Sequence, residues 1–142
     1  NSMIVKQVSV FVENTVGRLA DLTKILTDNN IDLKASTIAE TVDFGILRCI
    51  VENPEKTVKI LVENGFSASI SEVTGVSLED KPGGLHKGLA VLAEAGIAVN
   101  YIYSTIKSAE GKAIIMMKTS DAAKAEEVLK ASGVELAGAD SF

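Results

Sequence analysis

The sequence has little of several features that define whole classes of protein. Its one cysteine, Cys49, excludes an internal disulfide. No apolar run approaches the ~18 residues needed to cross a bilayer, and Ala113–Met117 is among the longest. No charged-then-apolar signal segment opens the chain. We therefore expect a cytoplasmic protein that does not associate with membranes.

Motifs for catalysis and cofactor binding are also missing. The sequence has no phosphate loop ending in Gly-Lys-Ser or Gly-Lys-Thr, no paired-histidine zinc motif, no Cys-x-x-Cys and no Gly-x-Ser-x-Gly. The one histidine, His86, has no cysteine or second histidine nearby, so we interpret it as a polar residue at the surface or at a pocket rim. These absences predict a protein that is not an enzyme and uses no cofactor or metal.

Composition narrows the fold and the partners. The net charge is −5, which argues against nucleic acid as a partner because its phosphates would be repelled. Hydrophobic residues make up 46% of the chain and aromatic residues only 4%, so the core must consist of Val, Ile, Leu and Ala. A length of 142 residues suits one ordinary domain or two small ones that support each other.

One strand-to-helix turn stands out. An apolar segment ends at Leu78 and Glu79, and the stretch Asp80-Lys81-Pro82-Gly83-Gly84-Leu85 leads into a helical pattern. Proline is tolerated in a first helical turn, and glycine lets a small molecule approach the main chain closely. The positive end of such a helix can hold a carboxylate or a phosphate. A degraded copy of the same turn occurs at Asn14-Thr15-Val16-Gly17-Arg18-Leu19.

The elements around both turns follow one order. A valine-rich segment predicts a strand over residues 5–12, and further extended segments are predicted over residues 31–39, 45–51 and 66–71. Helical periodicity predicts helices over residues 16–29 and 55–64, and a turn at Thr41–Asp43 predicts a hairpin. The order is βαββαβ, and the second half of the chain repeats it.

The repeat has a constant spacing over most of its length. Gly17 and Gly83 lie 66 residues apart, as do the pairs Leu19 and Leu85, Ile31 and Ile97, and Gly45 and Gly111. Gly65 and Gly133, which we expect to cap helix C-termini, lie 68 residues apart. This change of spacing predicts a two-residue insertion near Thr119–Ala122. An internal duplication with units at residues 3–71 and 72–142 follows, each unit a four-stranded antiparallel sheet with both helices on one face.

The turn Asp80-Lys81-Pro82-Gly83-Gly84-Leu85 within a βαββαβ unit of this length resembles the ACT domain family of amino-acid-sensing regulatory modules. The likeness covers nearly the whole chain as a tandem pair. The first copy departs from it, with Asn14 where an acidic residue is expected and Val16 where proline is expected. The resemblance implies an α+β fold in which two ferredoxin-like units pair side by side into an eight-stranded antiparallel sheet.

The resemblance also implies a ligand between the turn of one unit and the second strand of the other. A free amino acid would place its carboxylate on the N–H groups of the turn and its ammonium on Asp80 or Asn14. If the pairing crosses over, the second turn faces the strand segment at Ala35–Ile38. The ligand-binding residues implied are Asn14, Thr15, Val16, Gly17, Arg18, Leu19, Ser36, Thr37, Ile38, Asp80, Lys81, Pro82, Gly83, Gly84, Leu85, Tyr101, Ile102 and Tyr103.

Several of these residues have a plainer interpretation. Asp80 and Asn14 could each be a helix N-cap. Gly17 and Gly83 could serve only to let a helix pack closely on a strand. Tyr101 and Tyr103 point to one side of a strand and could suggest an RNA platform, but the acidic balance argues against it. Cys49 lies within an apolar strand, where buried packing is expected instead of chemistry.

The sequence predicts a homodimer and leaves three hypotheses for the function. The strand at Ala113–Met117 is apolar on both faces, and Phe11 and Cys49 point away from Val10 and Arg48, so part of the helix-free sheet face should be buried in a homodimer. The first hypothesis is a non-catalytic regulatory module that binds a small-molecule amino acid. The second is a ligand-free structural or docking dimer, a regulatory subunit of a metabolic enzyme. An enzyme on this fold is the third.

Overall fold

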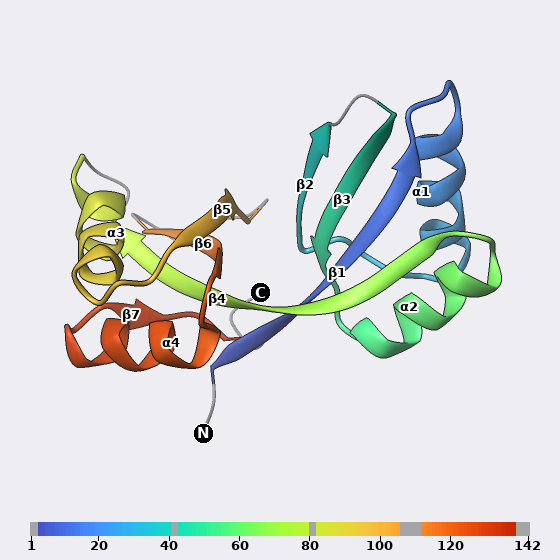
Figure 1. The fold of residues 1–142 in the computed structure, drawn as a ribbon. Coiled ribbons are helices and arrows are strands. Elements are labelled where there is room, and N and C mark those ends of the chain that lie inside the picture. Colours follow the sequence, from blue (N-terminus) through green and yellow to red (C-terminus); the bar gives the residue numbers. More distant parts are fainter. Residues whose placement is uncertain (1–2, 41–42, 80–81, 106–111, 139–142) are drawn as a thin grey trace. The chain divides into compact units, whose positions relative to one another are not determined.

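The computed structural model describes residues 3–40, 43–79, 82–105 and 112–138. The chain divides into two compact units (Figure 1). The first unit is Lys6–Ser71, and the second unit is Glu72–Phe142 together with Asn1–Val5. The expected turn at Thr41–Asp43 and the landmark Gly111 lie wholly or partly outside the described residues.

The first unit has the βαββα order expected from the sequence, followed by a further strand. Its sheet has the order β2-β3-β1, with β4 beside β1, and the β2–β3 and β1–β3 pairs are antiparallel. Asn53 caps α2 through its side chain and Pro54 occupies the first turn, as helix N-termini favour. The elements are β1 (Ile4–Glu13), α1 (Arg18–Asp28), β2 (Ala35–Glu40), β3 (Phe44–Ile50), α2 (Pro54–Glu63) and β4 (Ser67–Glu79).

The second unit repeats this arrangement. Its sheet has the order β5-β6-β4, with β7 on the other side of β4, so the strand order matches that of the first unit. Asp121 caps α4 through its side chain, as Asn53 caps α2. The α+β fold with antiparallel pairing and four described helices is therefore confirmed. The remaining elements are α3 (Gly84–Glu94), β5 (Val99–Ser104), β6 (Lys112–Thr119), α4 (Ala122–Ala131) and β7 (Glu135–Leu136).

The number of strands differs from the expectation. The described residues form seven strands, where the sequence led us to expect eight. The last strand expected in the first unit and the first strand expected in the second unit form one strand, β4. This strand runs without a break from Ser67 to Glu79 and contributes residues to both units. No proline, asparagine or aspartate occurs in this strand to end it. A strand that the sequence divides near Ser71–Val73 is therefore continuous.

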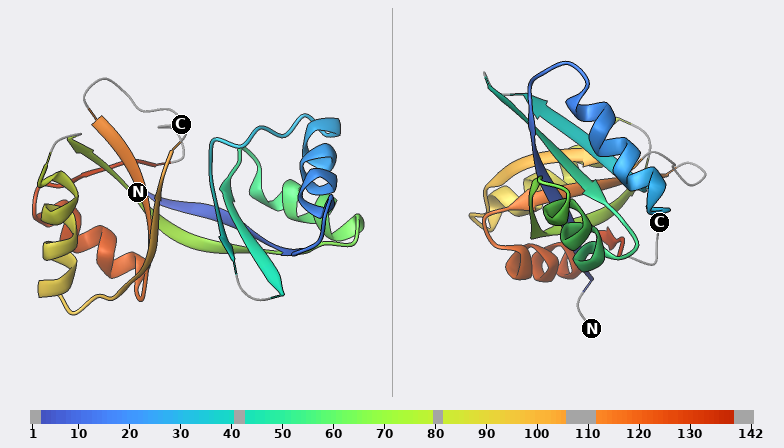
Figure 2. Two further views of the ribbon diagram at one scale, coloured as in Figure 1. Left: turned by 90° about the horizontal axis from the view of Figure 1, so that it is seen from above. Right: turned by 90° about the vertical axis from the view of Figure 1, so that its right-hand side faces the viewer.

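In each unit the helices cover one face of the strands, as Figures 1 and 2 show. The first core joins Val8, Val10 and Leu47 of the strands to Leu22 and Leu26 of α1 and to further buried residues. The second core joins strand and helix residues in the same way, and its fully buried members are Val76, Leu92, Met117, Ala125 and Leu129. No described helix has the length and apolar character needed to span a bilayer.

Strand pairing shows that the two-residue insertion lies in a different place from the one predicted. Val8 pairs with Cys49 in the first unit, and Thr74 pairs with Met117 in the second. Equivalent positions of β1 and β4 are therefore 66 residues apart, whereas equivalent positions of β3 and β6 are 68 residues apart. The insertion thus lies between β5 and β6, and the prediction of Thr119–Ala122 is wrong. The equal spacing of Gly45 and Gly111 was a coincidence of composition.

The two cores fill one position in opposite ways. Leu22 of α1 and Cys49 of β3 correspond, through these spacings, to Gly88 of α3 and Met117 of β6. A β-carbon added to Gly88 would meet Met117 Cε at 3.9 Å, an ordinary packing distance. The first unit therefore combines a large helix residue, Leu22, with a small strand residue, Cys49. The second unit combines a small helix residue, Gly88, with a large strand residue. Close packing requires this kind of compensation.

Two buried threonines distinguish the second core from the first. Thr74 and Thr119 are each 2% exposed, and their Oγ1 atoms have no hydrogen-bond partner within the described part of the chain. The strand spacings place them at the positions of Val8 and Val51, both buried in the first core. Threonine has nearly the shape of valine but adds a hydroxyl, and an unsatisfied buried hydroxyl destabilises a fold.

Cys49 is buried as expected but on a different face. The sequence led us to group it with Phe11 on the helix-free face, and this is wrong, because Cys49 belongs to the core beneath α1 and α2. Strand β3 is apolar over most of its length, so alternation does not reveal its inward side. Burial raises the pKa of the Cys49 thiol to about 12, which keeps it neutral and unreactive at physiological pH.

Candidate functional site

The turn between β4 and α3 leaves main-chain donors open. Gly83 is the N-cap of α3 in a left-handed conformation, with φ of 93°, and no side chain caps the helix. The N–H groups of Gly84, Leu85 and His86 make no hydrogen bond to a described acceptor. Pro82 precedes the cap and lies two residues before the first residue of α3, whereas the sequence placed it in the first helical turn. Asp80 and Lys81 lie outside the described residues.

Gly84 holds the start of α3 against the end of β4. A β-carbon at this position would lie 2.4 Å from the Glu79 carbonyl oxygen, so no side chain fits without a shift of the backbone. At Gly83 the same test finds open space, and there the left-handed φ is what favours glycine. The second glycine of the turn therefore serves close packing, and the first serves the turn itself. Leu85 packs against the second core.

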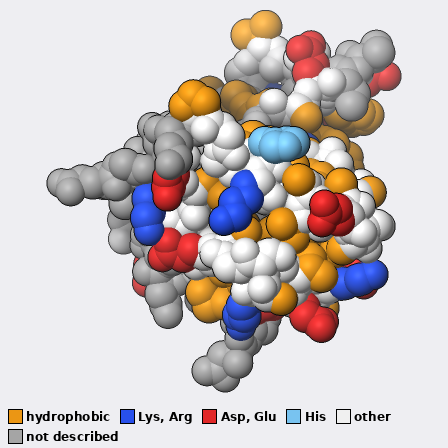
Figure 3. Space-filling view, turned by 90° about the vertical axis from the view of Figure 1, so that its left-hand side faces the viewer, with side chains coloured by type: hydrophobic (Ala, Val, Ile, Leu, Met, Phe, Trp, Pro, Cys, Tyr) orange, Lys and Arg blue, Asp and Glu red, His pale blue; other side chains and the backbone are white. Residues whose placement is uncertain are grey.

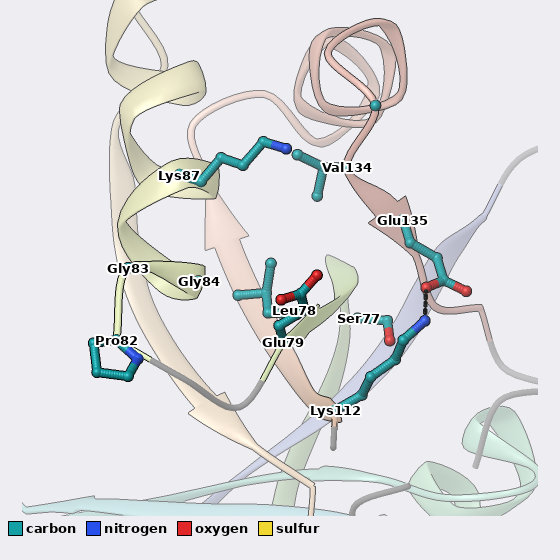
Figure 4. Close-up of a pocket in the computed structure, with 11 residues that line it drawn as sticks. Ser77, Leu78, Glu79, Pro82, Gly83, Gly84, Lys87, Lys112, Val134 and Glu135 are labelled. Atoms are coloured by element: carbon teal, nitrogen blue, oxygen red, sulfur yellow. Dashed lines mark hydrogen bonds and ion pairs between the residues drawn. The ribbon is translucent and has the colours of Figure 1, made fainter. Parts of the chain in front are cut away.

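A pocket of about 470 Å³ opens beside this turn, entirely within the second unit. Figure 4 shows that its wall is formed by α3, the end of β4, the start of β6 and the segment that leads into β7. Its volume is in the range of small-molecule sites. The lining residues are Ser77, Leu78, Glu79, Pro82, Gly83, Gly84, Lys87, Lys112, Gly133, Val134 and Glu135.

Charged groups of both signs line this pocket. Lys112 Nζ lies 2.7 Å from Glu135 Oε2, and this hydrogen bond, the charge of Glu135 and a smaller contribution from Glu79 raise the pKa of Lys112. Lys87 makes no ion pair or hydrogen bond within the described residues. Figure 4 shows the Glu79 carboxylate directed into the pocket and Lys87 extending across it in the direction of Val134. The pocket therefore offers an uncommitted cation and a carboxylate.

The first turn has the same backbone and a different surrounding. Gly17 caps α1 with φ of 86°, again without a side-chain cap. The Arg18 guanidinium carbon lies 3.9 Å from the centre of the Phe66 ring, and Arg18 Nη1 lies 3.9 Å from Asp21 Oδ2. A pocket of only about 110 Å³ lies near this turn. Its lining residues are Val12, Glu13, Asn14, Thr15, Leu19, Ile38, Gly45 and Leu47.

Other residues of the first turn are placed as follows. Asn14 is not the helix cap; its Nδ2 donates to Glu40 Oε1 at 3.4 Å. The Thr15 N–H donates to the Glu13 carbonyl at 2.8 Å, and Val16 is fully exposed. Of the residues expected from β2, Ile38 lines the small pocket of its own unit.

The residues expected from the second strands lie where the sequence placed them. Ser36 and Thr37 are half-buried on β2. Tyr101 and Tyr103 lie on one side of β5 with their rings stacked, 6.4 Å between centres, and Ile102 is partly exposed. The expected meeting of these strands with the turn of the opposite unit stays a prediction.

Sequence reasoning missed the part of the pocket that lies far from the turn. Glu79, Lys87, Lys112 and Glu135 were not among the expected site residues. One signal was available for Lys87: it lies at the start of α3, where the helix dipole disfavours a cation. Lys112 and Glu135 carry no such signal, since only the pairing of β4 with β6 and β7 brings them to the turn.

The surface around α3 and α4 has no field of a single sign. Figure 3 shows basic and acidic side chains interspersed with apolar ones, and the imidazole lies at the surface. His86 is exposed, as expected. Within the described ranges no group of three or more His, Cys, Asp or Glu side chains is placed to hold a metal ion.

Comparisons with known proteins bear on the whole chain. A family model described as an ACT domain pair matches residues 3–140. The crystal structure of a Bacteroides thetaiotaomicron protein is similar, with 41% identity over 98% of this chain and 95% of that chain and a TM-score of 0.91. No curated protein matches the chain significantly.

Two more distant structures share the fold alone. The regulatory subunit of aspartate kinase from Thermus thermophilus is 13% identical over 92% of this chain and 93% of that chain, with a TM-score of 0.65. The regulatory subunit of aspartate kinase from Thermus flavus is 12% identical over 93% of this chain and 97% of that chain, with a TM-score of 0.61.

Proposed function

The chain belongs to the family of ACT domain pairs, and on this premise we propose that it is a non-catalytic regulatory module that binds a free amino acid. The observation that carries the proposal is the open turn of the second unit. There, N–H groups at the start of α3 that have no acceptor among the described residues adjoin a pocket of about 470 Å³. This pocket contains a carboxylate and a lysine that has no partner in the described part of the chain. A zwitterion requires both signs of charge within a few ångströms of each other.

The proposed site extends to the second strands, as the family resemblance implies. Ser36, Thr37 and Ile38 of β2 would complete the site at the second turn. The resemblance assigns Tyr101, Ile102 and Tyr103 of β5 to the first turn, beside which Arg18 covers the Phe66 ring. A ligand that binds one conformation of the protein better than another shifts the population toward that conformation, which is how a binding module without catalytic groups can regulate a partner.

A panel of the twenty amino acids in a thermal-shift measurement tests the proposal. One or a few of them should raise the melting temperature, because a ligand that binds only the folded state stabilises it by about 2.7 kcal/mol at 100 times its dissociation constant. For a chain of this length that corresponds to roughly 5–10 °C. Absence of a shift with every amino acid at millimolar concentration would contradict the proposal and favour a structural role.

A second candidate function, docking as a dimer, is favoured by one observation. Phe11 and Phe44 lie on the helix-free face of the first unit, 49% and 47% exposed, with their rings 6.5 Å apart in an edge-to-face arrangement. The corresponding positions of the second unit hold Ser77 and Lys112. Large exposed aromatic side chains in contact favour a protein interface over solvent.

We therefore expect the protein to be a homodimer whose contact includes this aromatic pair. Light scattering at micromolar concentration should give twice the mass of the chain. Phe11→Lys with Phe44→Lys should lower that mass, whereas Val62→Lys, on the exposed side of α2, should leave it unchanged. A wild-type monomer at that concentration would defeat the proposal. The same dimer could serve as a regulatory subunit of a metabolic enzyme.

A further inference from the structure

The two units differ most at three corresponding positions around the turn. Arg18, Asp21 and Phe66 of the first unit correspond to Gly84, Lys87 and Val134 of the second. The spacing is 66 residues for the two positions at the start of the helix. It is 68 for the third, which lies beyond the insertion between β5 and β6.

In the first unit these three residues form a self-contained cluster. The Arg18 guanidinium stacks on the Phe66 ring at 3.9 Å and lies 3.9 Å from the Asp21 carboxylate. The Arg18 side chain is 27% exposed, so most of its surface is covered. A cation of this unit's own chain thus takes up the space between the start of α1 and the segment at Phe66, and its charge is balanced by Asp21.

In the second unit all three members of the cluster are changed, and two of the changes empty this space. Gly84 has no side chain to fill it, and the Glu79 carbonyl prevents it from gaining one. Val134 replaces the ring with a smaller group. Lys87 replaces the carboxylate with a cation, and that cation has no partner among the described residues. Gly84, Lys87 and Val134 all line the resulting pocket of about 470 Å³.

The reversed charge indicates what the empty space accepts. In the first unit Arg18 lies beside Asp21, whereas Lys87 of the second unit has no anionic partner among the described residues. A ligand carboxylate would satisfy Lys87. The Glu79 carboxylate, which also acts on Lys112, is directed into the same pocket (Figure 4). Lys112, which lines the same pocket, is already paired with Glu135.

We propose that each chain binds one free amino acid, in the second unit, with its carboxylate on Lys87, and that Arg18 occupies the corresponding space of the first unit and excludes ligand there. This inference rests on the proposed function. It adds to that function a stoichiometry, a unit and a residue that receives the carboxylate.

Titration calorimetry on the full chain tests the proposal with two probes. The first probe is the panel amino acid that gives the largest thermal shift, and the second is its α-carboxamide, which lacks the negative charge. The variants are Lys87→Met, Lys87→Arg and, as a matched control, Lys59→Met on the exposed side of α2. Melting curves without ligand establish that each variant is folded.

The wild type should bind one amino acid per chain. Lys87→Met should weaken binding about 10- to 150-fold, the range for loss of a hydrogen bond to a charged group. The α-carboxamide should bind the wild type about as weakly as the amino acid binds Lys87→Met. The Lys87→Met variant should bind the amino acid and its α-carboxamide with the same affinity. Lys87→Arg should keep most of the affinity, and Lys59→Met all of it.

Three results would overturn the proposal, and they differ in how far they reach. Binding of two amino acids per chain would show that Arg18 does not exclude ligand. Wild-type affinity in Lys87→Met, or a full acid-over-amide preference in that variant, would show that Lys87 does not receive the carboxylate. Either result leaves the amino-acid-binding function intact. A panel without any ligand would remove the function and this proposal together.

Discussion

Met117→Cys is expected to lower the free energy of unfolding by about 2–4 kcal/mol, because it leaves a cavity against a glycine that cannot fill it. Met117 is fully buried in the second core, and Gly88 of α3 faces it with no side chain. The corresponding position of the first unit tolerates cysteine only because Leu22 of α1 is there. Urea denaturation of the variant measures the loss.

The same comparison predicts a rescue. Gly88→Leu alone should cost about 1–3 kcal/mol, because leucine would be forced against the Met117 side chain. The double variant Gly88→Leu/Met117→Cys reproduces the arrangement of Leu22 and Cys49 and should return to within about 1 kcal/mol of the wild type. Strictly additive losses would show that the two positions do not compensate each other. The reverse pair in the first unit, Leu22→Gly with Cys49→Met, provides the matched control.

Thr74→Val combined with Thr119→Val should stabilise the protein, by about 1–3 kcal/mol for each substitution. Each removes a buried hydroxyl that has no hydrogen-bond partner in the described part of the structure and leaves a side chain of nearly the same shape. The first unit already has valine at both positions, as Val8 and Val51. The midpoint of urea denaturation should rise with an unchanged slope.

The reciprocal substitutions supply the control. Val8→Thr and Val51→Thr place the same hydroxyls in the first core and should cost a similar amount each. If the threonine-to-valine changes leave stability unchanged or lower it, an ordered water must satisfy the two hydroxyls. The interpretation of the threonines as unsatisfied groups would then be wrong.

The sequence was a good guide to the elements and their order. Proline and glycine mark the ends of α2, and leucines at helical spacing mark α1, because these signals act within a few residues of where they occur. The glycine landmarks revealed the duplication, since Gly17 and Gly83 occupy the same left-handed position in both turns. Local chemistry was therefore sufficient for the fold class.

The errors occurred where the answer depends on pairing between distant segments. Gly45 and Gly111 suggested that the original spacing continues into β6, and only the pairing of Val8 with Cys49 and of Thr74 with Met117 shows that it does not. The face of Cys49 was misjudged because β3 is apolar on both sides. Continuity of β4 through Ser71 could not be read from a segment that has neither a strong turn signal nor a clear alternation.

The candidate site shows the same division. Pro82, Gly83 and Gly84 were identified because the turn has a sequence pattern of its own. Lys112 and Glu135 were not, because they reach the pocket through the β4–β6 and β4–β7 pairs. The role of Arg18 was also out of reach, since nothing in the sequence places a residue at position 18 over the ring of Phe66.

Strand β4 has a further consequence for the halves as separate pieces. Residues before Glu72 belong to the first unit and those from Glu72 onward to the second, and β1 crosses the same division near Val5. Cleavage after Ser71 would divide strand β4, so that each fragment would keep only part of this strand. We therefore expect the two fragments to be poorly stable alone and to reassemble when mixed, so that the duplication produced two cores within one cooperative folding unit.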